Sequence, residues 1–184
     1  MEGPAVQSRL GGGPPSAAAL AKLLSSLPSD QRATLVDANR TGLDLHLGIH
    51  YEAVEDERVV ATLVVTENHL QPYALTHGGV YAAMLESVCS VGAAFAELAR
   101  GHNAVGLENT TRFHRATRLG ARLRAEATPA AEAHRNRGRW EATITDETGE
   151  VCASGQLVVA ILGPDVVVGG EAVVLPDVEV PGIE

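Results

Sequence analysis

Residues 76–94, THGGVYAAMLESVCSVGAA, contain the start and most of the longest helix that the sequence predicts. We place this helix from about Gly79 to about Ala99, because alanine, the strongest helix former, recurs along it. Apolar side chains occur on every side of the helix rather than along one stripe: Val80, Met84, Leu85, Val88, Val91, Phe95 and Leu98. A helix of this kind is expected to be buried on nearly every side, in the middle of the fold.

Strand-like segments lie on both sides of this helix. Two alternating runs, 43–53 and 58–66, precede it, and an acidic turn joins them. Four further stretches follow it, at 104–114, 121–131, 138–145 and 151–162. Alternation of apolar and polar residues is typical of half-buried strands. The order predicts an α+β domain of the hotdog type, in which an antiparallel sheet wraps around one long central helix.

The two ends of the chain differ from this domain. Residues 1–15 are rich in Gly and Pro and are expected to be a disordered leader. Residues 16–34 are expected to hold a short amphipathic helix, ended by Pro28, and a polar connection, before a domain at 35–162. The tail at 163–184 has five acids and no base. It is interpreted either as flexible or as an added edge strand.

Charge is distributed unevenly along the chain. The formal net charge is −9, which argues against a nucleic-acid-binding surface over the whole protein. Residues 112–139, however, contain eight arginines and only two acids, a formal charge of +6. Such a segment suits one compact polyphosphate ligand. The alternative is that these arginines are the solvated faces of alternating strands.

Cysteine and histidine usage gives no sign of a metal or a disulfide. Cys89 and Cys152 are expected to be small core residues rather than nucleophiles. The seven histidines lack the spacing of metal ligands, so we predict no metal and no cofactor. The start of the chain lacks the basic and apolar regions of a signal peptide, so we expect a cytoplasmic protein without a membrane segment.

Two features of the central helix suggest chemistry. Gly78 and Gly79 at its start allow a ligand to approach the backbone, and the unpaired N–H groups there favour negative charge. Glu86 lies among apolar neighbours, where a carboxylate is costly unless it is paired or functional. Ser90, one turn later, is placed to bond it. The alternatives are an ordinary Gly-Gly turn and a solvent-exposed strip of helix.

The separation of these two features predicts an oligomer. At ~1.5 Å per residue, Glu86 lies roughly 10 Å along the axis from Gly79, too far for one helix to present both groups to one carbonyl. Two such helices, packed antiparallel across a two-fold axis, bring the glycine end of one to the middle of the other. We therefore expect activity to require at least a dimer.

The helix sequence resembles hotdog thioesterases of the phenylacetyl-CoA and 4-hydroxybenzoyl-CoA type, including the nine-residue step from His77 to Glu86. The resemblance extends over about 43–162 and implies that Glu86 is the nucleophile or general base and that the Gly78 amide polarises the thioester carbonyl. It also implies further catalytic positions: Gln71 lies near the carbonyl or the attacking water, Ser90 supplies an assisting hydroxyl, and His77 and Gly79 belong to the helix-start motif.

The same resemblance implies where coenzyme A binds. Arg115 is expected to contact a coenzyme A phosphate, and the turn at Asn136, Arg137 and Gly138 is expected to lie near the nucleotide. A tetramer is plausible by this resemblance alone.

Two other functions remain open at this point. One is a hotdog hydratase or dehydratase acting on enoyl thioesters with a His/carboxylate pair, although the proline-containing motif of such enzymes is not found. The other is a non-catalytic hotdog protein that binds acyl-CoA through the basic segment. For a thioesterase, aryl, phenylacetyl and medium-chain fatty acyl groups are all compatible with the sequence.

Overall fold

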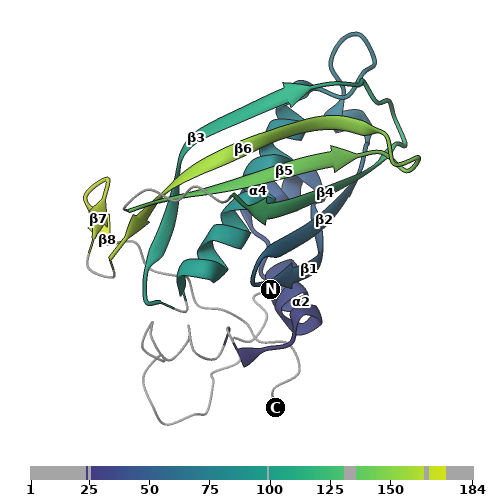
Figure 1. Ribbon diagram of the computed structural model, residues 1–184. Helices are drawn as coiled ribbons and strands as arrows, with labels where there is room; N and C mark the ends of the chain where they lie inside the picture. Colours follow the sequence, from purple (N-terminus) through teal and green to yellow (C-terminus); the bar gives the residue numbers. More distant parts are fainter. Residues whose placement is uncertain (1–23, 25, 99, 131–135, 164–165, 173–184) are drawn as a thin grey trace, which may run out of the picture.

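Six antiparallel strands form the main sheet, in the order β1-β2-β4-β5-β6-β3 (Figure 1). The computed structural model describes residues 24, 26–98, 100–130, 136–163 and 166–172. The strands of the main sheet are β1 (His50–Glu55), β2 (Arg58–Val64), β3 (Asn103–Phe113), β4 (Arg122–Pro129), β5 (Arg137–Thr145) and β6 (Val151–Leu162). Strand β3 comes directly after the long helix but pairs with β6, so it forms one open edge of the sheet.

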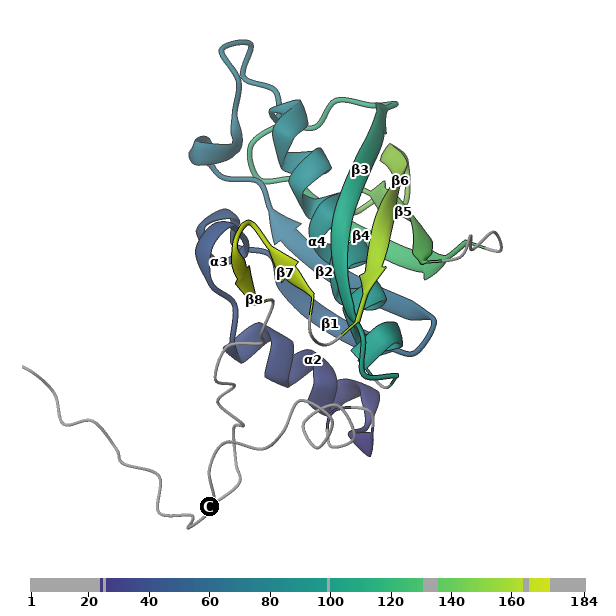
Figure 2. The ribbon, with the colours of Figure 1, turned by 90° about the vertical axis from the view of Figure 1, so that its left-hand side faces the viewer.

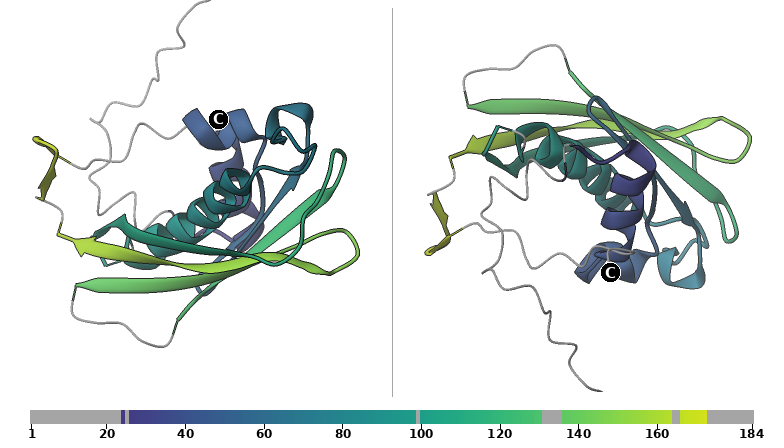
Figure 3. Two further views of the ribbon diagram at one scale, coloured as in Figure 1. Left: turned by 90° about the horizontal axis from the view of Figure 1, so that it is seen from above. Right: turned by 90° about the horizontal axis from the view of Figure 1, so that it is seen from below.

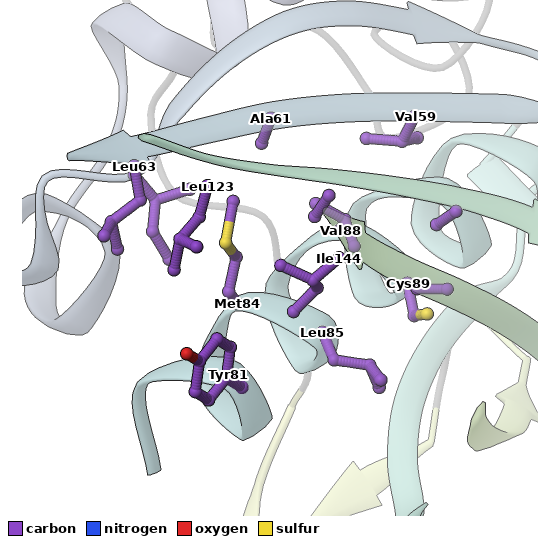
Figure 4. Packing of buried hydrophobic residues seen from close by; sticks show 14 of the residues in the cluster. Val59, Ala61, Leu63, Tyr81, Met84, Leu85, Val88, Cys89, Leu123 and Ile144 are labelled. Atoms are coloured by element: carbon purple, nitrogen blue, oxygen red, sulfur yellow. The ribbon is translucent and has the colours of Figure 1, made fainter. Parts of the chain in front are cut away.

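Helix α4 (Gly78–Leu98) lies against one face of the sheet, which curves around it (Figure 3). Its length and apolar composition would also suit a membrane span, but here the helix packs against β2, β3, β4, β5 and β6. Each large apolar side chain that leaves water there contributes about 1.5–3 kcal/mol. Figure 4 shows part of this core, including Met84, Leu85, Val88, Leu63, Leu123 and Ile144. The predicted hotdog arrangement is confirmed.

One flank of α4 is less buried than its composition predicts. Ala82, Glu86, Ser90 and Ala94 follow one another at four-residue steps, and all four are only half-buried within a single chain. The expectation of burial on nearly every side is therefore not met by one protomer. This flank faces away from the core residues of α4, and Asn109 of the edge strand β3 donates hydrogen bonds to it, at the Ala82 carbonyl and the Glu86 carboxylate.

The first predicted strand is wrong in its first half. The chain forms helix α3 (Gly42–Leu47) where a strand from Leu43 was expected, and β1 begins only at His50. The alternation of three leucines imitates a strand, but Leu43 and Leu45 are exposed. Gly48, at a φ of 65°, ends the helix in the left-handed conformation that glycine accepts easily.

A second difference lies in the residues expected to form a polar connection. Helix α2 (Ser29–Ala38) begins directly after Pro28 and packs on β1. The sequence does not show that this helix packs on the sheet, because its composition is polar and one of its buried residues is the charged Arg32. The Arg32 guanidinium donates to the Leu27 carbonyl at 2.8 Å and to Asp56 at 2.5 Å, so its charge is compensated. The hydrogen bonds make an arginine an acceptable buried residue here.

The described part of the acidic tail forms a small hairpin. Strands β7 (Val167–Val168) and β8 (Glu171–Ala172) make a separate two-stranded sheet and do not extend the main one (Figure 2). The predicted leader at 1–15, residues 16–23 of the predicted N-terminal helix and residues 173–184 of the tail lie outside the described residues.

The contact between β3 and β6 leaves no space for a side chain at Gly155. A Cβ there would collide with the backbone oxygen of Thr110 and would lie 2.8 Å from Cδ1 of Leu85. We expect Gly155→Ala to destabilise the protein by about 3 kcal/mol and to lower the Tm by about 10 °C, measured by thermal unfolding. Gly163→Ala is the matched control, because nothing lies within 4 Å of a Cβ at that position. Equal Tm values for the two variants would contradict this account of the β3–β6 contact.

Candidate active site

The Glu86 carboxylate lies between α4 and the edge strand β3. One oxygen, Oε2, accepts a hydrogen bond from Nδ2 of Asn109 on β3 at 2.9 Å. The other, Oε1, accepts a longer bond of 3.4 Å from the Ser90 hydroxyl one helical turn later. The predicted pairing of Ser90 with Glu86 is therefore present in the structure. The half-buried carboxylate is thus held by two neutral donors, one on each oxygen.

The start of α4 presents an unpaired backbone donor. The His77 ring caps the helix, since its Nδ1 accepts a hydrogen bond from the Gly79 N–H at 2.9 Å. This bond requires the tautomer of His77 that carries its hydrogen on Nε2. The His77 carbonyl accepts from the Val80 N–H at 2.9 Å. Within the part of the chain that the structure describes, the Gly78 N–H has no hydrogen-bond partner.

Buried hydroxyls hold this helix start in place. The Thr117 hydroxyl lies 2.7 Å from those of both Thr76 and Tyr81, and the Thr76 N–H donates to the Thr117 carbonyl at 2.9 Å. The Phe113 ring packs over Gly78, where a Cβ would lie 3.0 Å from its tip. The position of the Gly78 amide is thus fixed by the loop that follows β3.

Gln71 lies in the loop that protrudes before α4 (Figure 2). Its N–H donates to the Leu75 carbonyl at 2.8 Å, and its carbonyl accepts from the Ala74 N–H at 2.9 Å. Ala74 has a left-handed φ of 54°, which a short non-glycine side chain adopts only in a tight turn of this kind. The Gln71 side chain makes no hydrogen bond within the described residues, so its amide is free to meet a ligand.

Glu86 and Gly78 are not brought together within one protomer. They are eight residues apart in a continuous helix, which corresponds to about 12 Å along the axis. A thioester carbonyl bonded to the Gly78 amide is therefore out of reach of the carboxylate of the same chain.

The predicted coenzyme A contacts lie at opposite ends of the sheet. Arg115 follows β3 and pairs with Asp146 at 3.2 Å, while its side chain stays 50% exposed. Hydrogen bonds from Thr148 chiefly lower the pKa of that Asp146 carboxyl, with Arg115 adding to them. Arg137 and Gly138 begin β5, after Asn136 at a left-handed φ of 65°. Because β5 spans roughly 30 Å, one protomer does not bring Arg115 and Arg137 together.

In the described part of the chain, the cysteines and histidines form no alternative centre. Burial, with the Glu86 charge adding to it, raises the pKa of the Cys89 thiol to about 12. Burial also raises the pKa of Cys152. Both are free, buried thiols, as predicted, and burial disfavours the thiolate form that a nucleophilic cysteine needs. Among the described residues, no three His, Cys, Asp or Glu side chains are grouped to bind a metal.

Three residues near this site were missed from the sequence: Asn109, Gly106 and Phe113. They belong to a segment that the sequence shows only as an alternating strand. Asn and Gly are depleted in strands, and this was the one signal available. Gly106 adjoins a register shift in β3, and a Cβ there would lie 2.7 Å from Oε1 of Glu86. The glycine therefore allows the carboxylate to approach the strand.

Comparison with known proteins identifies the family. A family model described as the thioesterase superfamily matches residues 73–153. The proofreading thioesterase EntH of Cronobacter sakazakii is 36% identical over 118 residues, which cover 64% of this chain and 84% of that protein. The chain belongs to the thioesterase superfamily.

Solved structures agree with this assignment. AziG of S. sahachiroi superposes with a TM-score of 0.62 and 31% identity, covering 67% of this thioesterase and 99% of that chain. The thioesterase HI1161 of Haemophilus influenzae gives a TM-score of 0.65 and 27% identity, covering 76% and 94%. The resemblance stated from the sequence is confirmed, and the protein is an acyl-thioester hydrolase with a hotdog fold.

Proposed function

We propose that this thioesterase hydrolyses acyl-CoA to the free acid and coenzyme A, in a site shared by two protomers. Glu86 of one protomer acts as nucleophile or general base, and the Gly78 amide of the other binds the carbonyl oxygen. One observation carries the proposal. The hydrogen-bonded Glu86 carboxylate and the unpaired Gly78 amide lie on the same helix, and they are too far apart to contact one substrate carbonyl within one chain.

The open edge of the sheet supports a dimer. Strand β3 is 11 residues long and exposes Leu107, and an edge of this length is a ready template for pairing with another strand. Antiparallel pairing of two β3 strands brings the Phe113 end of one chain beside the Gly106 region of the other. The Gly78 amide packed on Phe113 then approaches the Glu86 that lies on Gly106, and the half-buried flank of α4 is covered.

The chemistry follows from this placement. The Gly78 N–H stabilises the negative charge that develops on the carbonyl oxygen, an effect typically worth about 3–4 kcal/mol. Glu86 either attacks the carbonyl carbon, with later hydrolysis of the anhydride, or removes a proton from an attacking water. A positioned base contributes about 10²- to 10⁴-fold in rate. The coenzyme A thiolate leaves in either route, and no metal or cofactor is required.

The remaining predicted residues take supporting roles in this proposal. Gln71 bonds the carbonyl or the water, Ser90 supports Glu86, and His77 with Gly79 forms the helix cap that leaves the Gly78 amide open. Antiparallel pairing also brings Arg115 of one chain towards the Asn136, Arg137 and Gly138 turn of the other, at the coenzyme A phosphates. The cytoplasmic location stays a prediction, and a tetramer is left to solution measurement.

The test is a thiol-release assay over aryl-, phenylacetyl- and medium-chain acyl-CoA substrates. Hydrolysis predicts release of free coenzyme A from at least one of them at a rate that saturates with substrate concentration. An enoyl-CoA is added to the panel, and loss of its enoyl absorbance without thiol release indicates a hydratase instead. Tight acyl-CoA binding without either reaction indicates a binding protein, and both results contradict the proposal.

A further inference from the structure

We propose that Asn109 is a positioning residue, which fixes one oxygen of the Glu86 carboxylate and leaves the other as the reacting atom. This inference rests on the proposed role of Glu86. It assigns separate tasks to the two oxygens: Oε2 is the anchor, and Oε1 attacks or takes the proton.

The Asn109 side chain uses both of its N–H donors on α4. Its Nδ2 lies 2.9 Å from Oε2 of Glu86 and 3.1 Å from the Ala82 carbonyl oxygen, one turn earlier on the same helix. An asparagine amide has two such donors, so both are occupied. The carboxylate is thereby held at a fixed place relative to the helix backbone.

The orientation of this amide is determined by a third partner. The Thr111 hydroxyl donates to Oδ1 of Asn109 at 2.8 Å. If the amide were turned over, its oxygen would face two acceptors, the carboxylate and the Ala82 carbonyl. Only one orientation therefore satisfies the neighbours.

The other carboxylate oxygen is held less firmly. Among the described residues, Oε1 accepts only the 3.4 Å bond from Ser90, and it lies over Gly106, where a Cβ would approach within 2.7 Å. No side chain at position 106 covers it. Oε1 is therefore the oxygen with capacity to form a new bond.

Fixing Oε2 matters for rate because a glutamate side chain has several rotatable bonds. A displacement of about 1 Å from the productive geometry is enough to lower a rate by about 10²-fold. Asn109 thus acts on the reaction through Glu86, without touching the substrate.

The experiment compares Asn109→Ala, Asn109→Asp and the control Thr110→Ala in the thiol-release assay. We expect Asn109→Ala to lower kcat by about 10- to 100-fold with KM changed less than about twofold. Asn109→Asp is expected to lose more, because it keeps the shape but directs a second carboxylate at Glu86. Thr110→Ala, which removes only a hydroxyl bonded to Glu108, is expected to retain wild-type kcat. Tm values verify that all three variants fold.

A purely structural role for Asn109 predicts the opposite order, with the isosteric Asp milder than Ala. Combination with Glu86→Gln gives a second readout, because a residue acting only through Glu86 adds no further loss in that background. Wild-type kcat in Asn109→Ala, or a further loss in the double variant equal to that in the single one, overturns this inference and leaves the proposed function standing. Absence of thiol release by the wild-type protein itself overturns both.

Discussion

Replacing Glu86 with Gln is expected to lower kcat by about 10³-fold, the largest effect of any single side chain in the protein. The amide keeps the size of the carboxylate and removes its negative charge. It therefore can neither attack an acyl carbon nor accept a proton from water. The change is measured as steady-state thiol release from the best acyl-CoA substrate, with Tm and oligomeric state unchanged.

Glu97→Gln is the matched control for this variant. Glu97 is a second carboxylate of α4, more deeply buried, and it pairs with Arg100 at 2.8 Å and His102 at 3.2 Å near the end of the helix. Its replacement is expected to reduce stability, because the Arg100 guanidinium loses its counter-ion and His102 loses a carboxylate hydrogen-bond partner, while kcat stays within a few-fold of wild type. Near-full turnover by Glu86→Gln, or an equal loss in both variants, would refute the assignment of Glu86.

Replacing Gly78 with Pro is expected to lower kcat by about 10²- to 10³-fold, because proline removes the N–H that we propose binds the oxyanion. Proline is well tolerated at the first position of a helix, where the missing N–H has no intrahelical partner. Gly78 occupies that position, and its N–H is unpaired within the described residues. The helix is therefore expected to form normally, as checked by circular dichroism.

Gly78→Ala provides the comparison, since it adds a Cβ against the Phe113 ring but keeps the N–H. Phe113 is 60% exposed and can move aside, so a modest loss of a few-fold is expected. The ratio of kcat between the two variants isolates the contribution of the amide hydrogen. Equal rates for Gly78→Pro and Gly78→Ala would show that the amide does not stabilise the transition state.

Local patterns in the sequence were sufficient for most of the fold. The alanine-rich helix and the strands after it have the predicted bounds to within two residues, because period and turn residues agree there. The segment at 42–47 was misassigned because its three leucines alternate. Asp44 of this helix accepts hydrogen bonds from Tyr51 at 2.8 Å and from Ser87 of α4 at 2.5 Å. The contact with Ser87 spans 43 residues, so a local pattern gives no sign of it.

The site residues on α4 could be predicted from the sequence, but those on β3 could not. Glu86 and Gly78 are conspicuous because a carboxylate in an apolar helix and two glycines at its start are unusual locally. Asn109 and Gly106 become recognisable as site residues only once β3 is known to pack against α4. The alternation of residues along a strand does not predict which helix the strand contacts. The distance between Gly78 and Glu86, in contrast, follows from helix geometry alone.

A subunit-mixing experiment tests the shared site most directly. Glu86→Gln and Gly78→Pro chains, carrying different tags, are co-expressed, and the doubly tagged heterodimer is isolated. One of its two sites then combines an intact Glu86 with an intact Gly78 amide from the other chain, so we predict about half of the wild-type activity per dimer. A heterodimer no more active than either parent homodimer would contradict a site built from two chains.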